Sequence, residues 1–130
     1  MQDSIFTKII KGEIPCHKIY EDDRTIAFLD IAPVQPGMTL VVSKTQVAHF
    51  EDLSPEDYQA LWATVQKVAK RMRHVYPDKA KIAIQVEGLD VDHAHAKVFP
   101  IDTPEDFRSH PKNGEPNHAE LAKLATKLAF

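Results

Sequence analysis

One long amphipathic segment constrains the fold more than any other feature of the sequence. Ser54 supplies a hydroxyl that can cap a helix, and Pro55 suits a first helical turn. Apolar side chains then recur at three- and four-residue spacings until Pro77 interrupts the pattern. The stripe consists of Tyr58, Leu61, Trp62, Val65, Ala69, Met72 and Tyr76. This pattern predicts the main core helix.

Five strand-like segments flank that helix. Residues 18–21, 25–30 and 38–43 precede it, separated by turn-forming acids and by a segment rich in proline and glycine, and their order predicts an antiparallel meander. After the helix, residues 81–86 alternate apolar and other side chains, and residues 92–100 alternate again. These last two segments are predicted to pair as a hairpin.

Both ends of the chain carry further helix signals. Ser4 can cap a short apolar helix that stops at Gly12, and Asn117 with Glu120 can open a final amphipathic helix. The polar stretch 109–116 is predicted to be an exposed loop. We therefore expect residues 1–130 to form one α+β domain with a five-stranded antiparallel sheet and two main helices.

Composition limits the choice of partners. The formal net charge of −3 provides no overall field for nucleic acid or an acidic membrane, so an anion site would have to be local. The single cysteine, Cys16, excludes an intramolecular disulfide and a cysteine-rich zinc site. With no apolar run long enough for a signal peptide or a membrane helix, we expect a soluble, cytoplasmic protein.

The segment 92–100 carries the chemistry. Side chains of a strand alternate between faces, so His93, His95 and Lys97 are predicted to share one face, with small apolar residues on the other. A neutral imidazole is a good nucleophile towards activated phosphorus, and His95 is central in this row. His93 and Lys97 could hold phosphate oxygens on either side.

An H-x-H pair is also a common zinc-binding arrangement. The chain has seven histidines, so a third ligand is available in principle. The ammonium group of Lys97 beside the pair argues against a divalent cation. The five histidines outside the pair are interpreted as solvated, and Cys16 as a small structural residue. These five are His17, His49, His74, His110 and His118.

Four separate motifs resemble the histidine triad family of nucleotide hydrolases and transferases. Residues 4–15 (SIFTKIIKGEIP) resemble its amino-terminal signature, and residues 27–33 (AFLDIAP) its nucleoside-pocket strand. Residues 37–44 (GMTLVVSK) resemble the following strand, and residues 88–97 (GLDVDHAHAK) the signature strand. Together these motifs extend the resemblance along nearly the whole chain.

The resemblance implies binding of a purine nucleoside monophosphate unit, AMP or GMP, by a homodimer in which two sheets join into a continuous ten-stranded one. It makes His95 the nucleophile that forms a nucleotidyl intermediate, with His93 supporting it, and it places Asp30 on the ribose hydroxyls. An ionised carboxylate is a pure acceptor, which suits that role. The apolar base pocket would consist of Ile5, Phe6, Ile9, Phe28, Leu29 and Ile31.

The chain departs from the family pattern in three places. Lys97 takes the position of the third histidine, so it keeps a positive charge but loses a group that exchanges protons near pH 7. Ser4 and Thr7 stand where many bacterial relatives carry a Cys-x-x-Cys zinc half-site, and Gln46 where they often carry a ligand histidine. These substitutions predict a chain without structural zinc.

The third departure adds carboxylates just before the histidine strand. Asp90 and Asp92 lie where relatives often present a polar residue to the phosphate, and Asp90 is predicted to border the nucleotide. Such carboxylates would repel the phosphate unless turned away. Alternatively, they would orient His93 or raise the pKa of its imidazole, or be solvated turn residues, an interpretation that fits Asp92 better than Asp90.

The leading hypothesis is a nucleotidyl hydrolase or transferase in which His95 attacks the α-phosphorus. No cofactor is required, although a divalent cation could accompany a polyphosphate substrate. The alternative is a nucleotide-binding protein with little or no turnover, because the third histidine is missing.

Overall fold

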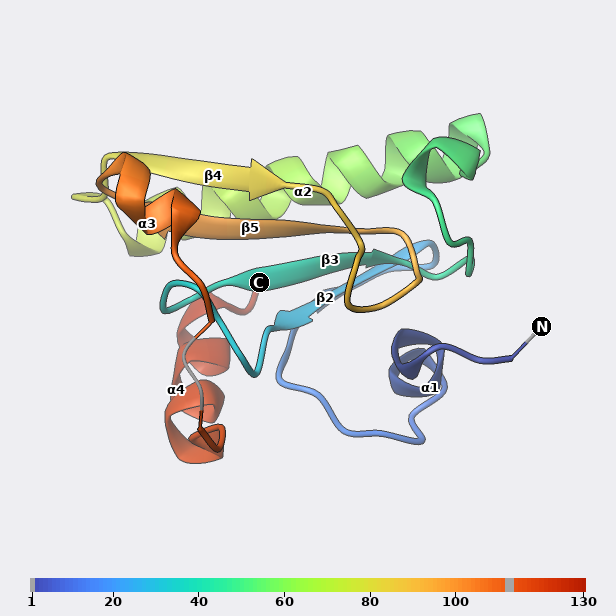
Figure 1. Cartoon of the computed structure of the whole chain (residues 1–130), viewed down its shortest axis with the longest axis horizontal. Helices are drawn as coiled ribbons and strands as arrows, with labels where there is room; N and C mark the ends of the chain where they lie inside the picture. Colours follow the sequence, from blue (N-terminus) through green and yellow to red (C-terminus); the bar gives the residue numbers. More distant parts are fainter. Residues whose placement is uncertain (1, 112–113) are drawn as a thin grey trace.

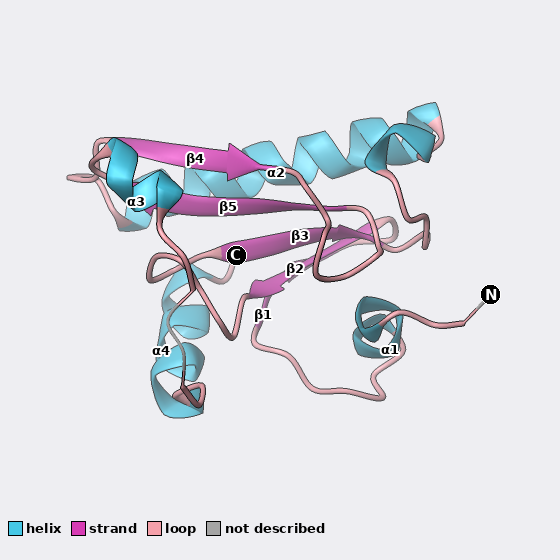
Figure 2. Ribbon diagram, in the orientation of Figure 1, coloured by secondary structure: helices cyan, strands magenta, loops and turns pink. Residues whose placement is uncertain are grey.

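The computed structural model describes residues 2–111 and 114–130. Its five strands form one antiparallel sheet in the order β1-β2-β3-β5-β4. The strands are β1 (Lys18–Glu21), β2 (Thr25–Leu29), β3 (Thr39–Ser43), β4 (Lys81–Gln85) and β5 (His95–Ile101). Both the predicted meander β1-β2-β3 and the predicted β4-β5 hairpin are present (Figure 2).

The predicted helices form with the predicted caps. They are α1 (Ile5–Ile10), α2 (Pro55–Val75) and α4 (His118–Leu128). The side chains of Ser4, Ser54 and Asn117 each accept a hydrogen bond from a backbone amide of the first helical turn. No helix in the described part of the chain is long and apolar enough to cross a membrane.

Two short helices were not predicted. They are η1 (Phe50–Asp52) and α3 (Pro104–Arg108). Thr103 and Asp106 form a reciprocal capping box at the start of α3, so its sequence signal was present but the segment is only five residues long. Residues 110, 111, 114 and 115 of the predicted exposed loop are exposed, whereas residues 112–113 lie outside the described residues.

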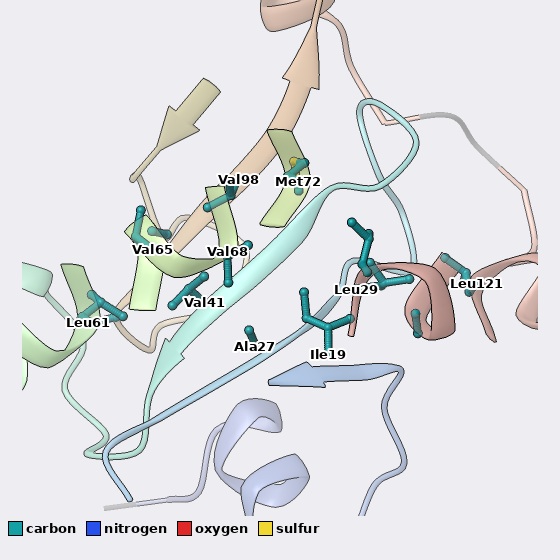
Figure 3. Close-up of a cluster of buried hydrophobic side chains, with 14 of the residues drawn as sticks. Ile19, Ala27, Leu29, Val41, Leu61, Val65, Val68, Met72, Val98 and Leu121 are labelled. Atoms are coloured by element: carbon teal, nitrogen blue, oxygen red, sulfur yellow. The ribbon is translucent and has the colours of Figure 1, made fainter. Parts of the chain in front are cut away.

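The two faces of the sheet are covered by different helices. On β2, Ala27 and Leu29 belong to the large core cluster, which also contains buried residues of α2 and α4 (Figure 3). Ile26 and Phe28 alternate with them and pack with Phe6 of α1 on the opposite face. Figure 1 shows α2 running along the sheet beside β4 and β5, with α1 beyond β2. The sheet is therefore buried on both faces around its centre.

The side chains of the histidine segment keep this alternation, although β5 itself begins only at His95: Ala94 belongs to the α2-side core cluster, and the His93 ring lies 5.7 Å from the ring of Phe6 in α1. His95 is paired with Val42 and Lys97 with Leu40 across the β3-β5 ladder, which puts both on the α1 side. Ala96, which lies between them, and Val98, which follows Lys97, point to the other face and belong to the α2-side core cluster. The prediction that the strand begins at residue 92 is wrong, because the backbone turns through His93, whose N–H donates to the carbonyl of Val91.

Candidate functional site

His95 is the first residue of β5, and its ring is held in one orientation. Only 5% of the residue is exposed. Its Nδ1 lies 2.6 Å from the backbone carbonyl of His93, and a carbonyl can only accept, so Nδ1 carries the proton and donates it. In the neutral ring the lone pair is therefore on Nε2, which has no hydrogen-bond partner among the described residues. This is the arrangement that a nucleophilic imidazole requires.

The surroundings of His95 keep the ring neutral. Burial lowers its pKa below the ordinary histidine value, and the positive charge of Lys97 acts in the same direction. The hydrogen bond to the His93 carbonyl and the charges of Glu87 and Asp30 oppose this, but the net pKa is lowered. The free base of His95 is thus favoured at neutral pH.

His93 is completely buried and does not line the pocket described below. Its Nε2–H donates to the carbonyl of Ser43 at 2.6 Å, and Nδ1 accepts from the Ser4 hydroxyl at 2.7 Å. Burial lowers its pKa. The suggestion that Asp90 and Asp92 orient this ring and raise its pKa is therefore wrong, since its partners are Ser4 and Ser43.

A pocket of about 510 Å³ extends from His95 along the α1 side of the sheet, within the range of small-molecule sites. Its wall contains all eight residues predicted to bind the nucleotide. Leu29 borders it while also belonging to the core cluster on the α2 side. The eight are Ile5, Phe6, Ile9, Phe28, Leu29, Asp30, Ile31 and Asp90. The Phe6 ring meets the His95 ring edge to face, with centroids 4.9 Å apart.

Asp30 both shapes a turn and borders the pocket. Its Oδ1 accepts a hydrogen bond from the Ala32 amide at 2.9 Å, which fixes the carboxylate at the end of β2. The other carboxylate oxygen, Oδ2, has no partner among the hydrogen bonds of the described residues. The carboxylate can therefore cap the turn and still accept from a ligand hydroxyl.

Lys97 lines the same pocket but is paired. Its ammonium group lies 3.0 Å from Oε1 of Glu87, and only 17% of the lysine side chain is exposed. Burial raises the pKa of Glu87, but hydrogen bonds from Lys97 and from backbone amides outweigh it, so the net pKa is lowered. The positive charge at this end of the pocket is thus largely compensated in the free protein.

A second cavity of about 450 Å³ also reaches His95. Three acids line it, Glu51 and Glu87 and Asp92, together with His49. More carboxylate side chains therefore lie near His95 than the histidine-lysine motif alone suggests.

Sequence reasoning missed part of the pocket wall. His17 and His118, interpreted as solvated, both line the pocket, and His17 Nε2 lies 2.9 Å from His118 Nδ1. They are about a hundred positions apart, so no local pattern could have paired them. Cys16 also lines the pocket, and burial raises the pKa of its thiol. The remaining unpredicted lining residues are Ile14, Pro15, Leu40 and Val91.

The zinc alternative for the H-x-H pair does not fit the geometry. Both ring nitrogens of His93 already have partners. Within residues 2–111 and 114–130, no group of three or more histidine, cysteine, aspartate or glutamate side chains is placed to hold a metal ion.

Fold and pocket together define a class: an α+β protein with a small-molecule pocket that ends at an imidazole with a free Nε2. The family model of the HIT (histidine triad) domain matches residues 11–103, and the chain belongs to the HIT domain family. The chain is 39% identical over 100 residues to the adenosine 5'-monophosphoramidase hnt1 of Schizosaccharomyces pombe, covering 74% of this chain and 72% of that protein.

Solved structures agree with the assignment. A Hit-like protein involved in cell-cycle regulation from Bartonella henselae, crystallised with an unknown ligand, matches with a TM-score of 0.84 and 30% identity over 97% of this chain and 93% of that one. A zinc-bound histidine triad family protein from Mycobacterium smegmatis matches with a TM-score of 0.74 and 27% identity, over 95% and 94%.

Proposed function

We propose that this protein hydrolyses nucleoside phosphoramidates, releasing a nucleoside monophosphate and an amine through a nucleotidyl intermediate on His95. The observation that carries the proposal is the bond from His95 Nδ1–H to the His93 carbonyl, which leaves a neutral Nε2 at the end of the pocket. The name of the fission yeast relative, an adenosine 5'-monophosphoramidase, supports the substrate class. The cytoplasm stays our expectation for its location.

The reaction has two displacement steps. The Nε2 lone pair attacks the α-phosphorus, the bond between phosphorus and the leaving nitrogen breaks, and the amine takes up a proton from water as it departs. A water molecule then attacks the same phosphorus, the bond between phosphorus and Nε2 of His95 breaks, and the monophosphate leaves, while the proton lost by this water neutralises the hydroxide left by the first step. Because Nδ1–H stays bonded to the His93 carbonyl, the positive charge that forms on the ring during attack is stabilised.

The other predicted site residues receive positioning roles. We assign the base to the apolar wall built by Phe6 and Phe28, and the ribose hydroxyls to the carboxylate of Asp30. Lys97, which we propose stands in place of a third histidine, neutralises charge on the phosphate oxygens. For this contact the phosphate has to compete with Glu87 for the ammonium group.

The acids around His95 favour an amine leaving group over a polyphosphate. Asp90 borders the main pocket, and Glu51 and Asp92 line the second cavity beside His95. A polyphosphate tail would bring further negative charges towards these carboxylates, whereas a neutral or cationic amine would not. We propose that no cofactor is needed for the phosphoramidate, and that a divalent cation would matter only for a polyphosphate.

We also propose a homodimer that joins two sheets along β4. This strand is at one edge of the sheet, and its Ile84 is 42% exposed. An exposed apolar edge strand is a template for pairing with a second copy.

Steady-state kinetics tests the proposal. We expect release of AMP from adenosine 5'-phosphoramidate to exceed release from diadenosine tetraphosphate by at least about tenfold in kcat/KM, and the His95→Gln variant to lose both activities by about a thousandfold or more. Binding of AMP without turnover of either substrate would favour the alternative, a nucleotide-binding protein in which Glu87 keeps Lys97 from the phosphate.

A further inference from the structure

A polar cluster lies between α1, the segment after β3 and the histidine segment. It consists of Ser4, Thr7, Gln46 and His93, and we call it the Ser4 cluster. The Ser4 hydroxyl donates to Nδ1 of His93 at 2.7 Å and accepts from the Thr7 amide at 3.0 Å. The Thr7 hydroxyl donates to Oε1 of Gln46, which also accepts from the Ser4 amide at 3.0 Å.

Ser4, Thr7 and Gln46 stand where the resemblance places zinc ligands, and a zinc-bound relative shares the fold. The donor set does not fit zinc. Two hydroxyls and a carboxamide are neutral oxygen groups, whereas zinc in proteins takes thiolates, imidazoles and carboxylates. The one imidazole, His93, already uses its Nδ1 to accept from Ser4. The four side chains instead satisfy one another.

We infer that the hydrogen bonds of the Ser4 cluster hold the His93 ring in place without a metal ion. We also infer that Ser4 is a positioning residue for the reactive imidazole of His95. The chain of contacts is continuous. Ser4 fixes Nδ1 of His93, the other ring nitrogen is fixed by the carbonyl of Ser43, and the backbone carbonyl of His93 holds Nδ1–H of His95. The orientation of His95 therefore depends on a hydroxyl at the start of α1.

The cluster also ties the pocket wall to the nucleophile. Ser4 is the N-cap of α1, which contributes Ile5, Phe6 and Ile9 to the pocket. Loss of the Ser4 side chain would loosen the helix and leave His93 Nδ1 without its partner in a buried site, which is unfavourable. The role in orienting His95 rests on the proposed function, whereas the metal-free cluster and its protonation state do not.

Two measurements that need no turnover test the cluster itself. Protein prepared in zinc-containing medium should hold less than about a tenth of an equivalent of zinc. Nitrogen-15 NMR of His93 should show a neutral ring protonated on Nε2 at pH 7. One equivalent of tightly held zinc, or a ring protonated on Nδ1, would overturn the inference.

The Ser4→Asp variant separates positioning from capping. Aspartate is as good an N-cap as serine but cannot donate to Nδ1, and its negative charge favours a protonated imidazole. We expect the pKa of His93 in NMR titrations to rise, and kcat on adenosine 5'-phosphoramidate to fall about tenfold, with KM changed less than threefold. The control is Ser54→Ala, which removes the N-cap of α2 and should change neither quantity.

An unchanged His93 titration in Ser4→Asp, or an equal loss of kcat in Ser54→Ala, would contradict the positioning role. If wild-type protein shows no turnover, the proposed function fails while zinc content and His93 titration still decide whether the cluster is as described.

Discussion

Acidification should destabilise this protein steeply through its two buried imidazoles. Burial lowers the pKa of both His93 and His95 in the folded state. In the unfolded chain a histidine takes up its proton near pH 6.5. Between these two pKa values the unfolded state binds more protons than the folded state, so the free energy of unfolding is highest above about pH 6.5 and falls as the pH decreases towards the folded pKa values.

The size of the effect follows from the number of protons. One additional proton bound on unfolding gives a slope of about 1.4 kcal/mol per pH unit, so two buried imidazoles give a limiting slope of about 2.7 kcal/mol per pH unit. Small domains are stable by only about 5–15 kcal/mol, so a slope of this size would be measurable within each pH unit in which it applies. The carboxylates with lowered pKa, such as Glu87, add to the loss only at more acidic pH.

Urea unfolding followed by the fluorescence of Trp62, the single tryptophan, measures this slope between pH 7.5 and 5.0. In His95→Gln one titrating ring is absent, so the slope should fall to about half of the wild-type value. A free energy of unfolding that stays constant down to pH 5.5, or an equal slope in wild type and variant, would refute the buried, neutral state of these rings.

Three further predictions concern the pocket and the sheet edge. Glu87→Gln should tighten AMP binding about fivefold in calorimetry, because the carboxylate that competes with the phosphate for Lys97 is removed. Unchanged affinity would show that Glu87 and the phosphate do not compete for Lys97. Asp30→Asn keeps an acceptor for the Ala32 amide, so it should weaken AMP binding about tenfold but 2',3'-dideoxy-AMP hardly at all; equal losses would argue against a ribose contact. Ile84→Lys should convert a dimer to a monomer in light scattering, and a wild-type monomer would contradict the proposed β4 interface.

The local elements of this fold were predictable because their signals are short-range. The caps Ser4, Ser54 and Asn117 lie within a few residues of the amides they bind, and the α2 stripe repeats within one helix. The alternation of His95 and Lys97 was likewise sufficient to place both on one face. A five-residue helix such as α3 depends on one capping box, which is too weak a pattern to stand alone.

Contacts between distant segments could not be predicted in the same way. His17 and His118 meet because α4 packs against β1 and β2, and Glu87 reaches Lys97 through the loop between β4 and β5. His93 was placed on the strand because it fits the alternation, but the turn that precedes β5 lets Ser4 and Ser43 hold its ring. The family resemblance, not local pattern, supplied the pocket residues that the structure brings together.

The most direct test of nucleophilic attack by His95 is a quenched single-turnover reaction with adenosine 5'-phosphoramidate, followed by mass spectrometry of the intact protein and its peptides. We expect an acid-labile adduct of one AMP unit on the peptide that contains His95, formed before free AMP appears and missing in His95→Gln. AMP release at the wild-type rate without such an adduct, or an adduct on another residue, would contradict nucleophilic attack by His95.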